Sequence, residues 1–153
     1  MTILETAIRF KGINLCEKQF YSSKENLSDG DLDFLSKTIN VLVRSDFGDK
    51  IHKFSMGKNK ILMKLKNLEV TDGNTKEKIN NPIVIYCIAE KKADEKPVNK
   101  CMNDTLTQFL KKFSINDITT KKPSKFKSFN EQLKKNFKKI ALKPEDRFKE
   151  ILF

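Results

Sequence analysis

The chain has 153 residues, of which 38% are hydrophobic and 33% are charged, and its formal net charge is +11. This length favours a single domain with a core of its own, and the charged fraction indicates a strongly ionic surface. Because no run approaches the roughly 18 apolar residues of a membrane-spanning helix, and the N-terminus lacks a signal-peptide pattern, we expect a cytoplasmic protein that can also lie peripherally on membranes.

The first half of the chain predicts a hairpin followed by a helix. Ile3–Phe10 and Ile13–Phe20 are apolar and β-branched, and Lys11-Gly12 between them is typical of a hairpin turn. Residues 21–30 are rich in Ser, Asn, Asp and Gly, as in a loop. Residues Asp31–Arg44 then predict a helix, because apolar side chains recur every three or four residues on one face: Leu32, Leu35, Ile39 and Leu42.

Three more strands are expected in the middle of the chain. Ile51–Met56 and Lys60–Leu68 are strand candidates joined by a turn at residues 57–59. After a polar connection over Thr71–Asn81, Pro82–Glu90 is apolar at successive positions. Such a run predicts a central strand that is buried on both faces.

The last third of the chain predicts two helices. After a charged loop over Lys91–Pro97, apolar residues recur at helical spacing from Val98 to Phe113. Pro123 interrupts the pattern, Ser124 is the expected cap of the next helix, and Pro144 ends it. The apolar stripe of this last helix is Phe126, Phe129, Leu133, Phe137 and Ile140.

Residues for catalysis are missing from the sequence. The one histidine, His52, has no cysteine or carboxylate at metal-ligand spacing, and the five glycines are all isolated, so a phosphate-binding loop cannot form. No Ser, Cys or Thr lies in a recognisable nucleophile motif. Cys16, Cys87 and Cys101 are expected to be reduced, small buried residues. We therefore expect no catalytic residue, no cofactor and no metal site.

Basic residues are concentrated near the C-terminus. Residues 121–153 contain eleven basic and four acidic side chains. Such a cluster can bind an anionic membrane or nucleic acid, or it can be the solvated face of an ordinary helix. Phe126 and Phe129 between lysines can stack on bases, but their helical spacing favours the core. The candidate anion-binding residues are Lys134, Lys135, Lys138 and Lys139.

The predicted order of elements, β-β-α-β-β-β-α-α, resembles the longin fold. The opening ILETAIRFKGINLC is similar to the first longin hairpin, and PIVIYCIAE with VNKCMNDTLTQFLKKF is similar to the last strand and the following helix. KKPSKFKSFNEQLKKNFKKI is similar to the final helix of longin-domain SNAREs. The resemblance implies an α+β (α/β) domain over residues 1–142, of longin or profilin-like type, with a short extension over residues 143–153. Its five-stranded antiparallel sheet would have helices on both faces.

The resemblance also implies a function. Longin relatives are non-catalytic protein-interaction modules of vesicle and membrane trafficking, so the expected partner is a small GTPase, a SNARE segment or a second longin or roadblock subunit. A homodimer and a role in regulating a small GTPase both stay open. Neither a SNARE heptad repeat nor a membrane anchor follows Ile140. The closing segment Pro144–Phe153 favours a stand-alone longin protein over an excised domain.

A candidate partner-binding surface lies beside the first helix and the strand Ile51–Met56. Two valines and a phenylalanine fall off the main stripe of the helix, where they are either ordinary core residues or a partly exposed docking surface. The candidate residues are Val41, Val43, Phe47, Ile51 and Phe54.

Overall fold

A computed structural model describes residues 3–21, 29–44, 51–71, 78–120 and 122–141. It contains a five-stranded antiparallel sheet with several helices, so the expected α+β class with five antiparallel strands is confirmed. The elements in chain order are β1 (Ile3–Phe10), β2 (Ile13–Gln19), α2 (Asp29–Arg44), β3 (Ile51–Met56), β4 (Asn59–Thr71), β5 (Lys78–Glu90), α3 (Glu95–Lys112), α4 (Ile115–Thr120), the 3₁₀-helix η1 (Pro123–Phe129) and α5 (Asn130–Ala141).

The strands lie in the order β2-β1-β5-β4-β3. The predicted hairpin between β1 and β2 is confirmed: Lys11 and Gly12 both have positive φ, 51° and 78°, as the two central residues of a type I′ turn require. β5 is the central strand, and it is buried from Pro82 to Ala89. The expectation of a central strand that is apolar on both faces is therefore correct.

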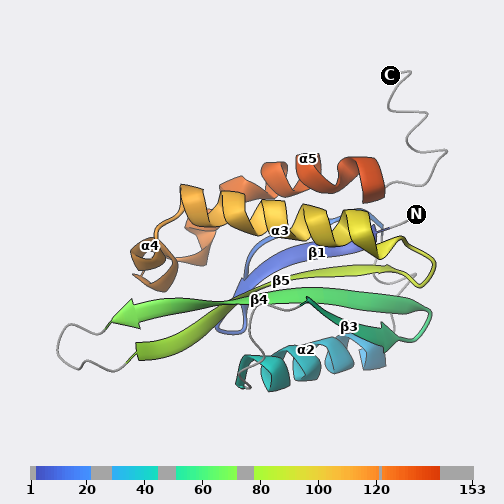
Figure 1. Cartoon of the computed structure of the whole chain (residues 1–153), viewed down its shortest axis with the longest axis horizontal. Helices are drawn as coiled ribbons and strands as arrows, with labels where there is room; N and C mark the ends of the chain where they lie inside the picture. Colours follow the sequence, from blue (N-terminus) through green and yellow to red (C-terminus); the bar gives the residue numbers. More distant parts are fainter. Residues whose placement is uncertain (1–2, 22–28, 45–50, 72–77, 121, 142–153) are drawn as a thin grey trace.

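The buried residues form two clusters, one on each face of the sheet. Successive side chains of β5 alternate between them, so that Ile85 belongs to the first cluster and Tyr86 to the second. The first cluster includes apolar side chains of α3, η1 and α5, whereas the second includes those of α2. In Figure 1, α3 and α5 are drawn on one side of the sheet and α2 on the other.

The first helix has the predicted stripe but begins two residues earlier than expected. Leu35, Ile39 and Leu42 are buried in the second cluster. α2 starts at Asp29, and the negative charges of Asp29 and Asp31 in its first turn stabilise this start because they lie at the positive end of the helix dipole. The side chains of Leu32 and Val43 lie outside the described residues.

The two longest strands extend beyond their predicted ends. The expected polar connection over Thr71–Asn81 is wrong at both of its ends, because β4 continues through Thr71 and β5 already begins at Lys78. Val70 pairs with Ile79 and Leu68 with Asn81 across this extension. Main-chain hydrogen bonds hold such a two-stranded ribbon whether its side chains are polar or apolar. The pattern of side chains in the sequence therefore could not predict this extension of the two strands. Residues 72–77 lie outside the described part of the chain.

Helix α3 begins before Pro97, although the sequence predicted a loop up to that residue. Asp94 is its N-cap, and its side chain accepts a hydrogen bond from the Lys96 N–H at 3.3 Å. Pro97 is tolerated in the first turn because N–H groups there have no partner within the helix.

The chain between α3 and α5 departs most from the prediction. The short helix α4 was not predicted, and Ser124 does not cap a helix, because Lys122 precedes a 3₁₀ segment that starts at Pro123. The α-helix starts only at Asn130. The predicted apolar stripe is nevertheless correct for four of its five members, because η1 and α5 bury Phe126, Phe129, Leu133 and Phe137, whereas Ile140 is partly buried. The predicted helix end at Pro144 and the extension over residues 143–153 lie outside the described residues.

Over the described ranges, no helix combines the length and the apolar character that crossing a membrane requires.

Candidate functional site

An apolar groove lies between α2 and β3. Phe34, Thr38 and Val41 recur at helical spacing on α2, one position before the buried stripe, and Phe54 of β3 lies across from them. Phe34 is 42% exposed and Val41 62% exposed, which is high for such large apolar side chains. The hollow measures about 320 Å³, and we call it the α2–β3 groove; it is lined by Phe34, Lys37, Thr38, Val41, Leu42 and Phe54.

One rim of the α2–β3 groove carries charge. Lys37 forms an ion pair with Asp33 at 2.9 Å, one helical turn away. Asp33 raises the pKa of the Lys37 ammonium, chiefly through their hydrogen bond. Because both side chains are well exposed, this pair adds little to stability, and it gives an otherwise apolar groove a polar edge.

The structure brings together only part of the predicted partner-binding set. Val41 and Phe54 both line the α2–β3 groove. Ile51 does not, because it is three residues from Phe54 on the same strand and packs against the first core cluster, on the opposite face of the sheet. The side chain of Val43 and all of Phe47 lie outside the described residues.

Phe34, Lys37 and Thr38 line the groove but were not predicted. Phe34 was missed because the predicted surface included only apolar residues near the C-terminal end of the helix. The signal was present, since Phe34 and Val41 are seven residues apart and therefore lie on one face.

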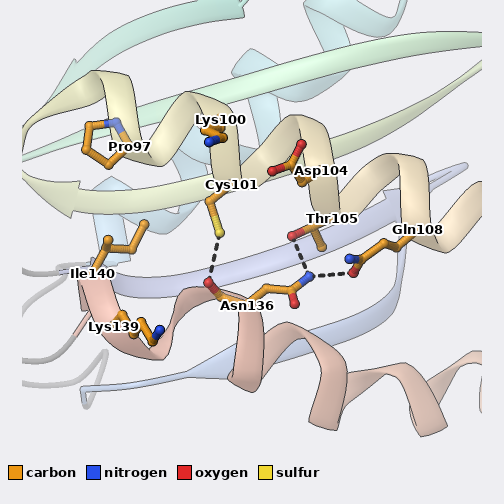
Figure 2. Close-up of a pocket in the computed structure, with 9 residues that line it drawn as sticks. All are labelled: Pro97, Lys100, Cys101, Asp104, Thr105, Gln108, Asn136, Lys139 and Ile140. Atoms are coloured by element: carbon orange, nitrogen blue, oxygen red, sulfur yellow. Dashed lines mark hydrogen bonds between the residues drawn. The ribbon is translucent and has the colours of Figure 1, made fainter.

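A second, more polar groove separates α3 from α5. Figure 2 shows that Pro97, Lys100, Cys101 and Asp104 of α3 face Asn136, Lys139 and Ile140 of α5 across it. We call this hollow of about 500 Å³ the α3–α5 groove, and Thr105 and Gln108 complete its lining.

Asn136 connects the two helices through its side chain. Its Nδ2 donates to Thr105 Oγ1 at 2.9 Å and to Gln108 Oε1 at 2.8 Å, as Figure 2 shows, and its Oδ1 accepts from Gln132 Nε2 at 2.8 Å. The carbonyl oxygen of Asn136 also accepts a hydrogen bond from the Cys101 thiol at 3.0 Å. The bonds between Asn136 and Cys101, Thr105 and Gln108 join α5 to α3, so they hold the two helices together.

The cysteines have the properties of unreactive thiols. Burial raises the pKa of Cys101 to about 11, although a hydrogen bond with Thr105 partly opposes this effect. Burial likewise raises the pKa of Cys16 to about 12 and that of Cys87 further. A thiol with a raised pKa stays protonated at neutral pH and is a poor nucleophile. The expectation of small buried residues is confirmed for Cys16 and Cys87, while Cys101 is half-buried.

The four predicted anion-binding lysines lie together on α5. Lys135 and Lys139 occupy the side of the helix opposite the buried stripe of Leu133, Phe137 and Ala141, whereas Lys134 and Lys138 lie beside that stripe. Lys139 lines the α3–α5 groove, and Lys135 is exposed. Lys134 and Lys138 are half-buried.

The described residues include no cluster of side chains that could hold a metal ion. His52 is half-buried on β3, and no three His, Cys, Asp or Glu side chains of the described ranges gather around it or elsewhere to bind a metal ion. The two grooves are therefore the candidate sites.

Compared with known proteins, the chain matches no family model and no curated protein.

Replacing Asn136 with alanine should lower the free energy of unfolding by about 1–3 kcal/mol, because Thr105, which is fully buried, loses a hydrogen-bond partner. Urea denaturation measures the change. Gln108→Ala is the control, since the exposed Gln108 makes only one of these bonds and its loss should cost about 0.5 kcal/mol or less. Equal effects of the two substitutions would contradict a structural role for the Asn136 network.

Proposed function

We propose that this chain is a non-catalytic protein-interaction module of longin type that acts in vesicle and membrane trafficking. The α2–β3 groove is its docking site, and the occupant is an apolar segment of a partner protein. A small GTPase, a SNARE segment, a tether subunit or a second longin subunit would each supply such a segment.

The apolar groove carries this proposal. Phe34 and Val41 expose large apolar surfaces beside Phe54, although burying such side chains in a monomer would stabilise it. Aromatic and aliphatic anchors in a pocket with a polar rim are typical of the centre of a protein interface. Lys37 and Asp33 provide such a rim.

The arrangement of elements supports the longin assignment. The resemblance implies a five-stranded antiparallel sheet with one helix on one side and two on the other. Five antiparallel strands, with α2 drawn on one side and α3 and α5 on the other, agree with that implication (Figure 1). Burial raises the pKa values of the three thiols, so they are poor nucleophiles at neutral pH.

Val41→Asp is expected to weaken partner binding at least about tenfold, because it places a charge in the middle of an apolar contact. The measurement is affinity capture from the lysate of the native host, with the bound proteins identified by mass spectrometry. Because Val41 is 62% exposed, the substitution should leave the thermal unfolding midpoint nearly unchanged.

Ile13→Asp is the matched control. Ile13 is 50% exposed on β2, at the other edge of the sheet from β3, so it tests an equal change of polarity outside the groove. The proposal predicts that trafficking proteins are captured by wild type and by the Ile13 variant but not by the Val41 variant. Capture that Val41→Asp leaves unchanged would overturn the assignment of the groove.

A further inference from the structure

The helical layer formed by α3, α4, η1 and α5 carries a concentrated positive charge. Among residues 95–141, leaving aside residue 121, there are eleven lysines and four carboxylates. Helix α2 in contrast carries three aspartates against Lys37 and Arg44. The two helical layers of the protein therefore differ in the sign of their charge.

Two of the four carboxylates are already engaged in ion pairs. Glu95 binds Lys53 at 3.1 Å and Lys60 at 3.2 Å, and Asp117 binds Lys125 at 3.4 Å. Within the described ranges, Lys100, Lys135 and Lys139 form neither an ion pair nor a hydrogen bond. These three ammonium groups remain available to an external anion.

The available lysines point away from the sheet. Lys100 and Lys139 line the α3–α5 groove from its two sides, so they share one outward face (Figure 2). Lys135 lies one turn before Lys139 and is exposed. We call Lys100, Lys135 and Lys139, with the neighbouring Lys134 and Lys138, the basic face.

We propose that the basic face binds an anionic lipid bilayer surface, such as one that contains phosphatidylserine. This inference goes beyond the proposed function and does not depend on it. Helices α3 and α5 lie side by side along the sheet (Figure 1), which spreads the lysines over a broad face, and a bilayer offers negative charge over a similarly broad area.

Nucleic acid fits the same face less well. Proteins that bind single strands stack bases on exposed aromatic rings, but the phenylalanines of α3, η1 and α5 are buried in the core, together with Phe113. Phe126 and Phe129, which interleave with lysines in the sequence, are 0% and 2% exposed. The basic face thus offers charge without a stacking platform.

The position of the basic face is compatible with docking on the other side of the protein. The α3 and α5 side chains contribute to the first core cluster and those of α2 to the second, so the basic face and the α2–β3 groove lie on opposite sides of the sheet. A bilayer on the basic face therefore leaves the groove open to a partner.

The test is flotation of the purified chain with vesicles of phosphatidylcholine alone or with phosphatidylserine added. Wild type is expected to float only with the anionic vesicles, and to be released by high salt, which shortens the screening length from about 8 Å at physiological ionic strength to about 3 Å at 1 M. In Lys135→Glu/Lys139→Glu, the membrane partition coefficient should fall at least about tenfold.

Lys11→Glu/Lys58→Glu is the matched control, because it changes the net charge by the same amount on the α2 side. Lys11 lines a hollow with Ile39 and Asn40 of α2, and Lys58 follows Gly57, which lies against Asp31 of α2. The control should float nearly like wild type. Equal recovery with both vesicle types, or an equal loss in both double variants, would overturn the proposal.

A parallel titration with labelled RNA and DNA at the same salt concentration separates lipid from nucleic acid. Tighter binding to a nucleic acid than to anionic vesicles, lost in Lys135→Glu/Lys139→Glu, would also overturn the proposal. Circular dichroism of both double variants verifies that each is folded.

Discussion

Phe109→Ala is expected to lower the free energy of unfolding by about 3–5 kcal/mol. Phe109 is fully buried on α3, and its ring centroid lies 4.9 Å from that of Phe113, 5.2 Å from that of Phe129 and 5.9 Å from that of Phe126. Alanine would remove the apolar surface, the edge-on contact with Phe129 and the two tilted ring contacts together, and would leave a cavity between α3 and η1.

Urea denaturation followed by far-UV circular dichroism measures this change. With a total stability of about 5–15 kcal/mol for a domain, the loss would shift the midpoint strongly. Ile115→Ala is the control, because Ile115 is 40% exposed at the start of α4 and should cost about 0.5 kcal/mol or less. A loss below about 1 kcal/mol for Phe109→Ala would mean that the aromatic cluster is not well packed.

The same cluster explains why the sequence predicted the core of the C-terminal region better than its helix boundaries. The spacing of Phe126 and Phe129 fits an α-helix, but three-residue spacing fits a 3₁₀-helix equally well. Both geometries bury the same two rings. Apolar periodicity therefore identified the buried residues while the local hydrogen-bonding pattern, and with it the expected cap at Ser124, was wrong.

Side-chain hydrogen bonds to edge strands could not be predicted, because they leave no periodic pattern in the sequence. The Glu17 N–H on the edge strand β2 donates to Asn130 Oδ1 at 2.8 Å, although the two residues are 113 positions apart. This bond satisfies a main-chain group at a sheet edge, where unpaired groups invite further strands. Nothing at Asn130 in the sequence distinguishes it from an ordinary polar residue.

The candidate docking surface could be predicted only in part. Helical spacing separated Val41 from the buried stripe of α2, and Val41 does line the α2–β3 groove together with Phe54. Ile51 was grouped with them because it lies on the same strand, but residues three apart on a strand point to opposite faces. Strand alternation alone would have separated Ile51 from Phe54, whereas the placement of Phe34 across from β3 required the tertiary structure.

Lys60→Ala is expected to lower the free energy of unfolding by about 2 kcal/mol at neutral pH. The Lys60 side chain is only 9% exposed, and its Nζ donates to the Ala93 carbonyl oxygen at 2.6 Å and to Glu95 at 3.2 Å. Alanine would leave that carbonyl oxygen, next to the start of α3, without its partner. Lys53→Ala should cost about 1 kcal/mol or less, because Lys53 binds the same carboxylate from a position that is 59% exposed.

The contribution of Lys60 to the free energy of unfolding should also depend on pH, and it should fall in acid. Hydrogen bonds from Lys53 and Lys60 lower the pKa of Glu95 from its ordinary value of 4.5. The stabilisation by ionised Glu95 is therefore complete above about pH 4.5 and is lost as the pH falls through the lower folded-state pKa. The bond to the Ala93 carbonyl oxygen does not involve the carboxylate. The difference in stability between wild type and Lys60→Ala, measured by urea denaturation, should thus shrink in acid without vanishing. A difference that stays constant with pH would mean that Glu95 adds nothing to the anchoring of α3 by Lys60.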